Sequence, residues 1–173
     1  MSSEFFAVLF LNLIICIYIY YDMKNLPSPI LPCMCANVRR AARALTQRYD
    51  EALRPLGLTI TQFTILQALS LAGEPTQGEL GEILAMDSTT LTRTLAIMTR
   101  NGWIGKHHGA DRRERRLRLT RAGEAEFNRA VPSWRKTQDA LRERLGKGRW
   151  DEITKLINDT ASILAEQPNS DAK

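Results

Sequence analysis

The sequence predicts a mainly α-helical fold that carries one small β-hairpin. From residue 33 onward, apolar residues recur at helical spacing over most of the chain. Only two short stretches, 103–108 and 115–120, alternate apolar and polar residues in the way that half-buried strands do. The chain has 173 residues, of which 44% are hydrophobic and 25% charged, so it is long enough for one domain with its own core.

Residues 1–32 are predicted to stand apart as an apolar segment followed by a proline-rich linker. Residues 5–21 form an apolar run of 17 residues interrupted by Asn12, near the lower limit of about 17 to 25 residues for a membrane-spanning helix. No Lys or Arg precedes this run and no small-residue cleavage site follows it, so a secretory signal is not expected. Two interpretations remain: a membrane anchor that keeps the basic domain in the cytoplasm, or a start codon assigned upstream of Met23 or Met34.

Long amphipathic helices are predicted at both ends of the domain. The first spans 35–55, and its apolar face comprises Val38, Ala42, Leu45, Tyr49, Ala52 and Leu56. The second segment, 121–166, begins after the capping residue Thr120 and is expected to be kinked or divided at Pro132 and broken at 146–148. A polar tail, 167–173, follows it.

A helix-turn-helix is predicted over 76–101. Thr76, with Glu79 three residues later, forms a capping box that starts the first helix. The second helix has one apolar face, while its opposite face carries small polar residues and Arg93. Two short helices with such an outer face are typical of a DNA-binding helix-turn-helix, and an ordinary helical hairpin is the alternative.

The hairpin that follows, within 103–120, is predicted to be an arginine-rich wing. Six of the ten residues 112–121 are Arg, and Leu117 and Leu119 alternate with Arg116 and Arg118 on one strand. A narrow minor groove has an enhanced negative potential that attracts inserted Arg. The net charge of +5 favours the same partner. We therefore predict a winged helix-turn-helix that binds double-stranded DNA.

Over residues 33–166 the chain resembles the MarR family of winged-helix regulators. The most specific part of the resemblance is the pattern DxRExR at 111–116, followed by LTxxG at 119–123. The stretch 88–93 is similar to the start of the family's recognition helix. The resemblance implies a homodimer in which the first helix and the last two helices interlock across a two-fold axis.

The resemblance also implies which residues bind DNA. Arg93 would meet a guanine edge in the major groove, and the backbone at Thr76 and Gln77 would meet phosphate at a helix N-terminus. Arg113 would reach into the minor groove, oriented by Asp111. The implied set covers both helices of the helix-turn-helix and the wing: Thr76, Gln77, Ser88, Thr89, Thr92, Arg93, Asp111, Arg112, Arg113, Arg115, Arg116 and Arg118.

Two cysteines open the first predicted helix. In the organic hydroperoxide sensor branch of the family, a reactive cysteine lies 20 residues before the Pro of a similar Pro-Leu-Gly-Leu, and Cys35 has this spacing from Pro55. Tyr49, 14 residues after Cys35, matches a tyrosine that hydrogen-bonds the cysteine in that branch. A helix N-terminus favours a reactive thiolate. Cys35, with Cys33 and Tyr49, is therefore a candidate redox-sensing group, and packing at the dimer interface is the alternative.

These patterns predict a regulator and not an enzyme. No Ser/His/Asp order, glycine-rich phosphate loop or carboxylate pair is present, so we expect no catalytic residue, metal or cofactor. The predicted function is a sequence-specific, cytoplasmic transcription regulator, namely a homodimeric repressor that binds an inverted-repeat operator and is released by a small molecule or oxidant. The alternative is a winged-helix module for protein contacts or non-specific nucleic-acid binding.

Overall fold

The computed structural model describes residues 32–109 and 114–165. The apolar segment 5–21, the linker before residue 32, the wing tip 110–113 and the polar tail lie outside the described residues. Contacts divide the chain into two compact units, 1–47 and 48–173. The second unit holds the core, the helix-turn-helix and the hairpin.

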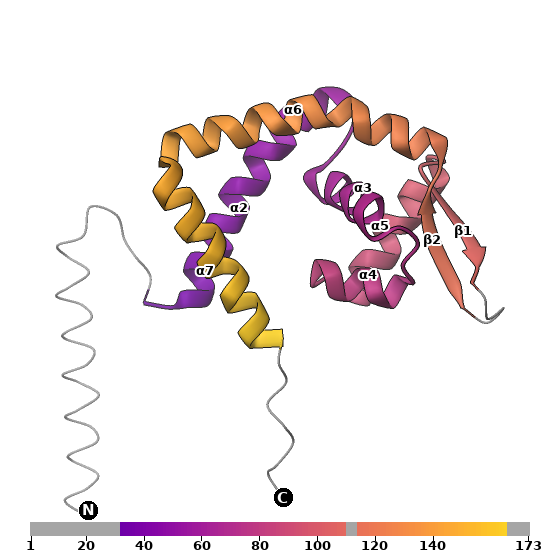
Figure 1. The fold of residues 1–173 in the computed structure, drawn as a ribbon, viewed down its shortest axis with the longest axis horizontal. Coiled ribbons are helices and arrows are strands. Elements are labelled where there is room, and N and C mark those ends of the chain that lie inside the picture. Colours follow the sequence, from indigo (N-terminus) through magenta and orange to yellow (C-terminus); the bar gives the residue numbers. More distant parts are fainter. Residues whose placement is uncertain (1–31, 110–113, 166–173) are drawn as a thin grey trace, which may run out of the picture. The chain divides into compact units, whose positions relative to one another are not determined.

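The predicted mainly helical fold with one hairpin is confirmed (Figure 1). The helices are α2 (Met34–Leu53), the short 3-10 helix η1 (Arg54–Leu56), α3 (Ile60–Ala72), α4 (Gln77–Leu84), α5 (Ser88–Arg100), α6 (Arg121–Leu145) and α7 (Lys147–Ala165). The strands β1 (Ile104–His108) and β2 (Arg115–Leu119) pair in antiparallel orientation directly after α5.

Side-chain caps fix where the helices of the second unit begin. Thr59 caps α3 and Thr76 caps α4, each as part of a capping box with the residue three positions later. Thr120 caps α6, since its hydroxyl accepts a hydrogen bond from the Gly123 N–H at 3.0 Å. A cap that the sequence interpretation missed is Asp87, whose carboxylate accepts from the Thr90 N–H at 2.9 Å and starts α5. Such caps satisfy N–H groups that have no partner inside the helix.

The core lies where α3, α5, the hairpin and the first half of α6 meet. Phe63 is fully buried at its centre, with its ring 5.4 Å from that of Phe127 and 5.5 Å from that of Trp134. Leu91, Leu95 and Met98 bury one face of α5 as predicted; the other buried apolar residues are Leu53, Leu58, Ile65, Leu66, Ala68, Leu69, Leu80, Ile104, Leu117 and Ala130. Trp134 is partly buried and stacks on Phe63 in this core.

Of the kink or division expected at Pro132, the division does not occur. Helix α6 runs unbroken from Arg121 to Leu145 with Pro132 inside it. Proline removes one helical hydrogen bond. On either side of Pro132, Phe127, Ala130 and Trp134 pack in or against the core. The real break is at Gly146 alone, which has φ of 78° and ψ of 146°, a conformation that favours glycine.

The described part of the chain offers no simple membrane span. Within residues 32–109 and 114–165, no single helix is both long and apolar enough to cross a membrane. Helix α2 with η1 passes that test only when joined to α3, as a pair bent by 83°.

Candidate nucleic-acid interface

Helix α5 presents a polar face outward. Ser88, Thr89, Thr92 and Arg93 are all exposed, while the opposite face of the helix is buried in the core. The Arg93 guanidinium makes no hydrogen bond or ion pair with any residue that the structure describes. The geometry thus leaves Arg93 available for an external acceptor, such as a base edge.

A side-chain hydrogen bond that the sequence did not reveal joins the two helices of the helix-turn-helix. The Gln77 Nε2 donates to the Thr92 hydroxyl at 2.7 Å, and that hydroxyl in turn donates to the Ser88 carbonyl at 2.6 Å. Two residues expected to contact DNA are therefore engaged with each other. This bond ties the start of α4 to the exposed face of α5.

The N-terminus of α4 is already capped within the protein. The Thr76 N–H donates to the Glu79 carboxylate at 2.7 Å, and the Glu79 N–H donates to the Thr76 hydroxyl at 3.2 Å. Hydrogen bonds with Thr76 hold the pKa of Glu79 below its ordinary value. The Thr76 N–H is thus engaged within the protein, and a phosphate contact at Thr76 and Gln77 stays a prediction. The N–H groups of Gln77 and Gly78 are the ones that an anion could reach.

The wing strands pair in a register that buries one side of the hairpin. Ile104 pairs with Leu119 and Lys106 with Leu117, and Ile104 and Leu117 are buried. The Leu117 N–H donates to the Pro75 carbonyl at 2.9 Å, and Thr76 forms an isolated bridge with Arg116. The segment that links α3 to α4 therefore lies against β2, held by one isolated bridge and one backbone hydrogen bond.

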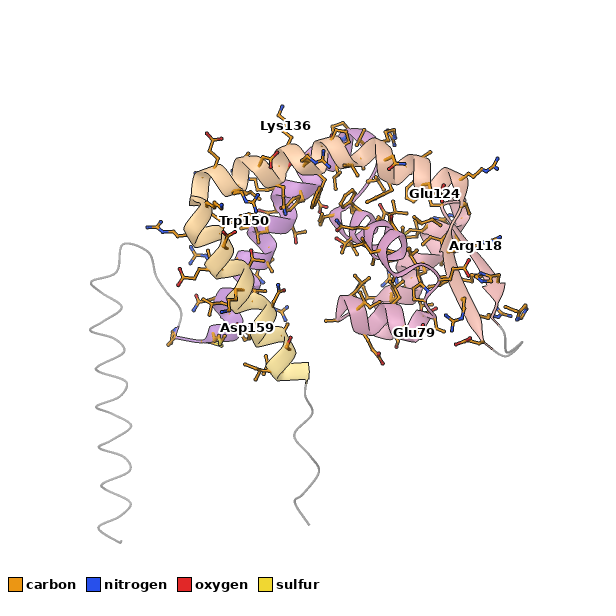
Figure 2. The ribbon with its side chains drawn as sticks, in the orientation of Figure 1. Glu79, Arg118, Glu124, Lys136, Trp150 and Asp159 are labelled. Carbon is orange, nitrogen blue, oxygen red and sulfur yellow. The ribbon has the colours of Figure 1, made fainter. Side chains whose placement is uncertain are left out.

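The arginines of β2 fall into two groups. Arg115 and Arg118 are exposed, and Figure 2 shows Arg118 extending from the wing. Arg116 is half-buried and ion-paired with Glu114, with N–O distances of 3.0 Å. Asp111, Arg112 and Arg113 lie outside the described residues.

The two described cysteines are free thiols. Cys33 and Cys35 are exposed. The Tyr49 hydroxyl donates a hydrogen bond to the Gln138 side chain of α6, and burial raises the pKa of Tyr49. An α-helix rises about 1.5 Å per residue, so an unbroken α2 separates Cys35 from Tyr49 by too much for a hydrogen bond within one chain. Any such bond would have to join two protomers.

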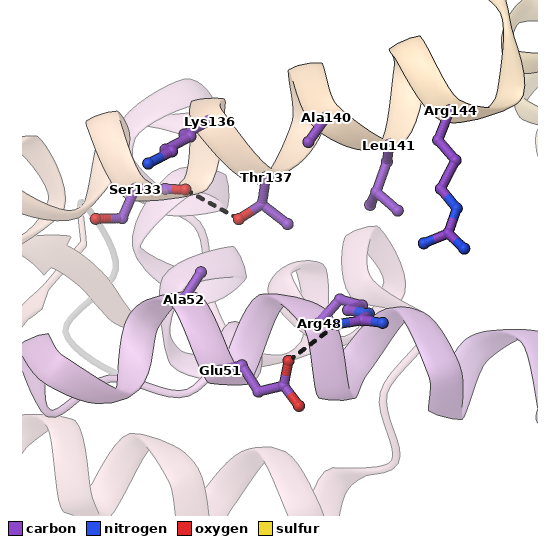
Figure 3. A pocket seen from close by; sticks show the side chains of 9 residues that line it. All are labelled: Arg48, Glu51, Ala52, Ser133, Lys136, Thr137, Ala140, Leu141 and Arg144. Carbon is purple, nitrogen blue, oxygen red and sulfur yellow. Dashed lines mark hydrogen bonds and ion pairs between the residues drawn. The ribbon is translucent and has the colours of Figure 1, made fainter.

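A groove lies between the end of α2 and α6 (Figure 3). Its volume is about 520 Å³, and Arg48, Lys136 and Arg144 line it together with Glu51 and small or apolar residues. Arg48 pairs with Glu51 at 3.4 Å. The lining thus combines an excess of positive charge with an apolar floor that includes Leu141.

The helix-turn-helix and the hairpin beside it define a winged helix-turn-helix protein. A model of the MarR family matches residues 56–114. The transcriptional regulator MosR of M. tuberculosis, in a structure in complex with DNA, is 41% identical; the match covers 77% of this chain and 96% of MosR, with a TM-score of 0.69. YwoH of Bacillus subtilis, an uncharacterized HTH-type transcriptional regulator, is 32% identical over 90 residues, which span 52% of this chain and 66% of YwoH.

The fold also matches a more distant structure. A mutant form of MarR from E. coli, complexed with operator DNA, is 22% identical over 73% of this chain and 92% of its own, with a TM-score of 0.67. The chain belongs to the MarR family. It is a transcriptional regulator and not an enzyme.

Proposed function

We propose that this protein is a homodimeric repressor that binds an inverted-repeat operator through α5 and the wing. One observation carries the proposal: the exposed polar face of α5, with an Arg93 that no described residue pairs, lies on the same unit as a wing whose Arg115 and Arg118 are exposed. The MosR structure in complex with DNA, from a protein 41% identical over most of the chain, supports DNA as the partner. Ser88 and Thr89 complete the base-reading face of α5, and Arg112 and Arg113, which lie outside the described residues, are proposed as further DNA contacts.

Exposed apolar surface supports a dimer. Helix α7 buries none of its described side chains, and Leu156 and Leu164 are 57% and 77% exposed. Met34 and Val38 at the start of α2 are 65% and 50% exposed. Exposed apolar residues of this kind on each helix are typical of an interaction site, and a second copy of the chain supplies matching apolar helices.

Release from DNA is proposed to follow a small molecule or an oxidant. The groove of Figure 3 fits a small anion with an apolar body, because its charged residues are mainly basic and its floor is apolar. The exposed thiols of Cys33 and Cys35 are the candidates for oxidation. The protein would act in the cytoplasm; the alternative of an anchor at 5–21 falls outside the described residues.

The test of this function is selection of bound fragments from genomic DNA by the purified protein, followed by footprinting. We expect an inverted repeat whose half-sites lie about 10 bp apart, centre to centre, and one dimer per duplex in analytical ultracentrifugation. A reporter gene placed behind the repeat should be less expressed when the protein is present. A monomer on a single half-site would contradict the dimer, and equal affinity for a scrambled duplex would favour a non-specific nucleic-acid module.

The trigger is tested on the same duplex. Operator affinity is measured before and after one equivalent of an organic hydroperoxide, for the wild type and for Cys35→Ser. Loss of affinity in the wild type but not in Cys35→Ser would assign sensing to Cys35. The thiol is oxidised to a sulfenic acid while the hydroperoxide is reduced to an alcohol. Unchanged wild-type affinity would make a small molecule the trigger and Cys35 a packing residue.

A further inference from the structure

Arg116 belongs to the wing, but the protein itself engages its guanidinium. The Nε and Nη2 groups donate to the two carboxylate oxygens of Glu114, each at 3.0 Å. The Nη1 donates to the backbone carbonyl of Glu74 at 2.9 Å. Arginine has five N–H donors. Three of them, one on each nitrogen of Arg116, are already bound to acceptors within the protein. Arg116 is therefore poorly placed to act as a phosphate contact.

The opposite strand makes a second link to the same segment. His107 pairs with Arg116 in the strand register, and its Nε2 lies 3.0 Å from the Glu74 carboxylate. The Nδ1 of His107 is buried and has no hydrogen-bond partner among the described residues. Both strands of the wing thus reach Glu74, which lies on the connection between α3 and α4.

These contacts continue toward the recognition helix. Glu74 is followed by Pro75 and Thr76, and Thr76 caps α4. The next residue, Gln77, donates to Thr92 of α5. The wing is therefore linked to the helix face that carries Arg93 by contacts at Glu74, the backbone of residues 74–77 and the hydrogen bond from Gln77.

Two carboxylates in this place need an explanation. A surface that binds a polyanion is weakened by negative charges on it, because like charges repel through the same Coulomb interaction that attracts arginine. Glu114 and Glu74 nevertheless sit beside the arginine strand, and both are occupied by Arg116 or His107. An internal positioning role accounts for their presence.

We propose that Arg116, Glu114, Glu74 and His107 form a wing clamp, which fixes the wing relative to the recognition helix. Arg116 is then a positioning residue and not a phosphate contact. The inference rests on the DNA binding proposed above. It differs from the expectation that Arg116 binds DNA in the same way as Arg118.

The change in operator affinity caused by three substitutions distinguishes a positioning role of Arg116 from a phosphate contact. Glu114→Gln removes a negative charge and frees Arg116, so a phosphate contact would bind operator more tightly. The wing clamp predicts the opposite, an affinity about three- to tenfold weaker, corresponding to about 0.7–1.4 kcal/mol. Arg116→Lys keeps the charge but loses the bidentate fork, so it should be as weak as Arg116→Gln if the residue positions the wing.

A charge-neutral variant supports the comparison. A Cβ on Gly109 would lie 2.5 Å from Glu114 Oε2 and 3.1 Å from Arg116 Nε, so Gly109→Ala displaces the pair without changing the net charge. We expect it to weaken operator binding as well. Arg118→Gln is the matched control on the same strand, because Arg118 is exposed and makes no ion pair with the described residues. It should lower the slope of log affinity against log salt by about one and leave the wing fold intact.

The second measurement needs no DNA. Amide hydrogen exchange of residues 104–119 should be about threefold faster or more in Glu114→Gln, Arg116→Lys and Gly109→Ala than in the wild type, and unchanged in Arg118→Gln. Thermal unfolding of each variant checks that the rest of the fold is intact. Since this readout is independent of the operator, faster exchange would support the wing clamp even if the proposed DNA binding failed.

The proposal is overturned if Glu114→Gln binds operator as tightly as the wild type, or more tightly, and exchange in the wing is unchanged. A double-mutant cycle of Glu114→Gln with Arg116→Gln gives the coupling. The wing clamp requires the double variant to be about as weak as either single variant. Fully additive losses would also refute it.

Discussion

Gly123, in the first turn of α6, lies directly against the backbone carbonyl of Trp103, so closely that a Cβ on Gly123 would overlap with that oxygen. The same carbonyl accepts the Thr120 N–H at 3.0 Å, and the Thr120 hydroxyl donates to the Gly102 carbonyl at 2.6 Å. The start of α6 is thereby seated on the turn between α5 and β1. This contact gives a physical reason for glycine at the end of the LTxxG pattern.

Gly123→Ala should therefore destabilise the fold. The neighbour is backbone and not a flexible side chain, so the added methyl group forces a shift that costs about 1–3 kcal/mol. Gly148→Ala is the control, since a Cβ there meets open space within α7 and alanine is the better helix former by up to about 1 kcal/mol. Urea denaturation of both variants measures the two effects. Equal stability of Gly123→Ala and the wild type would contradict the close contact between Gly123 and the Trp103 carbonyl.

Arg93 and Arg118 should differ in how they contribute to binding. Arg93→Ala is expected to cost about 1–3 kcal/mol and to relax the preference at one base position, because an arginine at a guanine edge reads sequence. Arg118→Ala should weaken all sequences alike and lower the salt slope by about one. Affinity for the operator, for single-base variants and for a scrambled duplex distinguishes them. A uniform loss for Arg93→Ala would remove α5 from the base-reading role.

Helix α7 should be required for assembly. Ile157 is 53% exposed in the single chain, so Ile157→Asp would place a charge in the proposed dimer interface, where an unpaired charge is costly. We expect a monomer in analytical ultracentrifugation and loss of operator binding. Lys155→Asp changes the charge on the same helix at an exposed polar position and should leave the dimer intact. A dimeric Ile157→Asp variant would move the interface elsewhere.

Acid should loosen the helix-turn-helix first at its caps. Hydrogen bonds with Thr76 hold the pKa of Glu79 below its ordinary value, and hydrogen bonds from Thr90 do the same for the pKa of Asp87. A carboxyl whose pKa is lower in the folded state stabilises the fold above its unfolded pKa of about 4, and this contribution is lost as the pH falls through the folded value. The thermal midpoint should therefore fall as the pH drops below about 4. The double variant Glu79→Gln with Asp87→Asn should show a smaller fall, and an equal fall would assign the acid sensitivity to other carboxyls.

Local signals made the helices and their caps predictable, whereas the wing contacts depend on distant residues. Thr76 and Thr120 each cap a helix through partners within three residues, which is why sequence spacing found them. Arg116 looked like the other wing arginines, because its partner carbonyl at Glu74 lies 42 positions earlier in the chain. Gln77 likewise reaches Thr92 across 15 positions. Contacts between residues so far apart in the chain depend on the tertiary fold, and the periodicity of apolar residues in the sequence does not predict them.

The hydrogen bond from Leu117 to the Pro75 carbonyl has a consequence for exchanging parts between relatives. A hairpin cut at residues 104 and 119 is not a complete module, because its inner strand is completed by backbone from the α3–α4 connection. A chimera that takes the wing alone would present Arg116 to a foreign loop that lacks the matching carbonyl position. The unit to transfer is therefore discontinuous, and residues 74–76 must be exchanged together with the hairpin. Without them, the orientation of the wing relative to the helix-turn-helix will be set by the receiving protein.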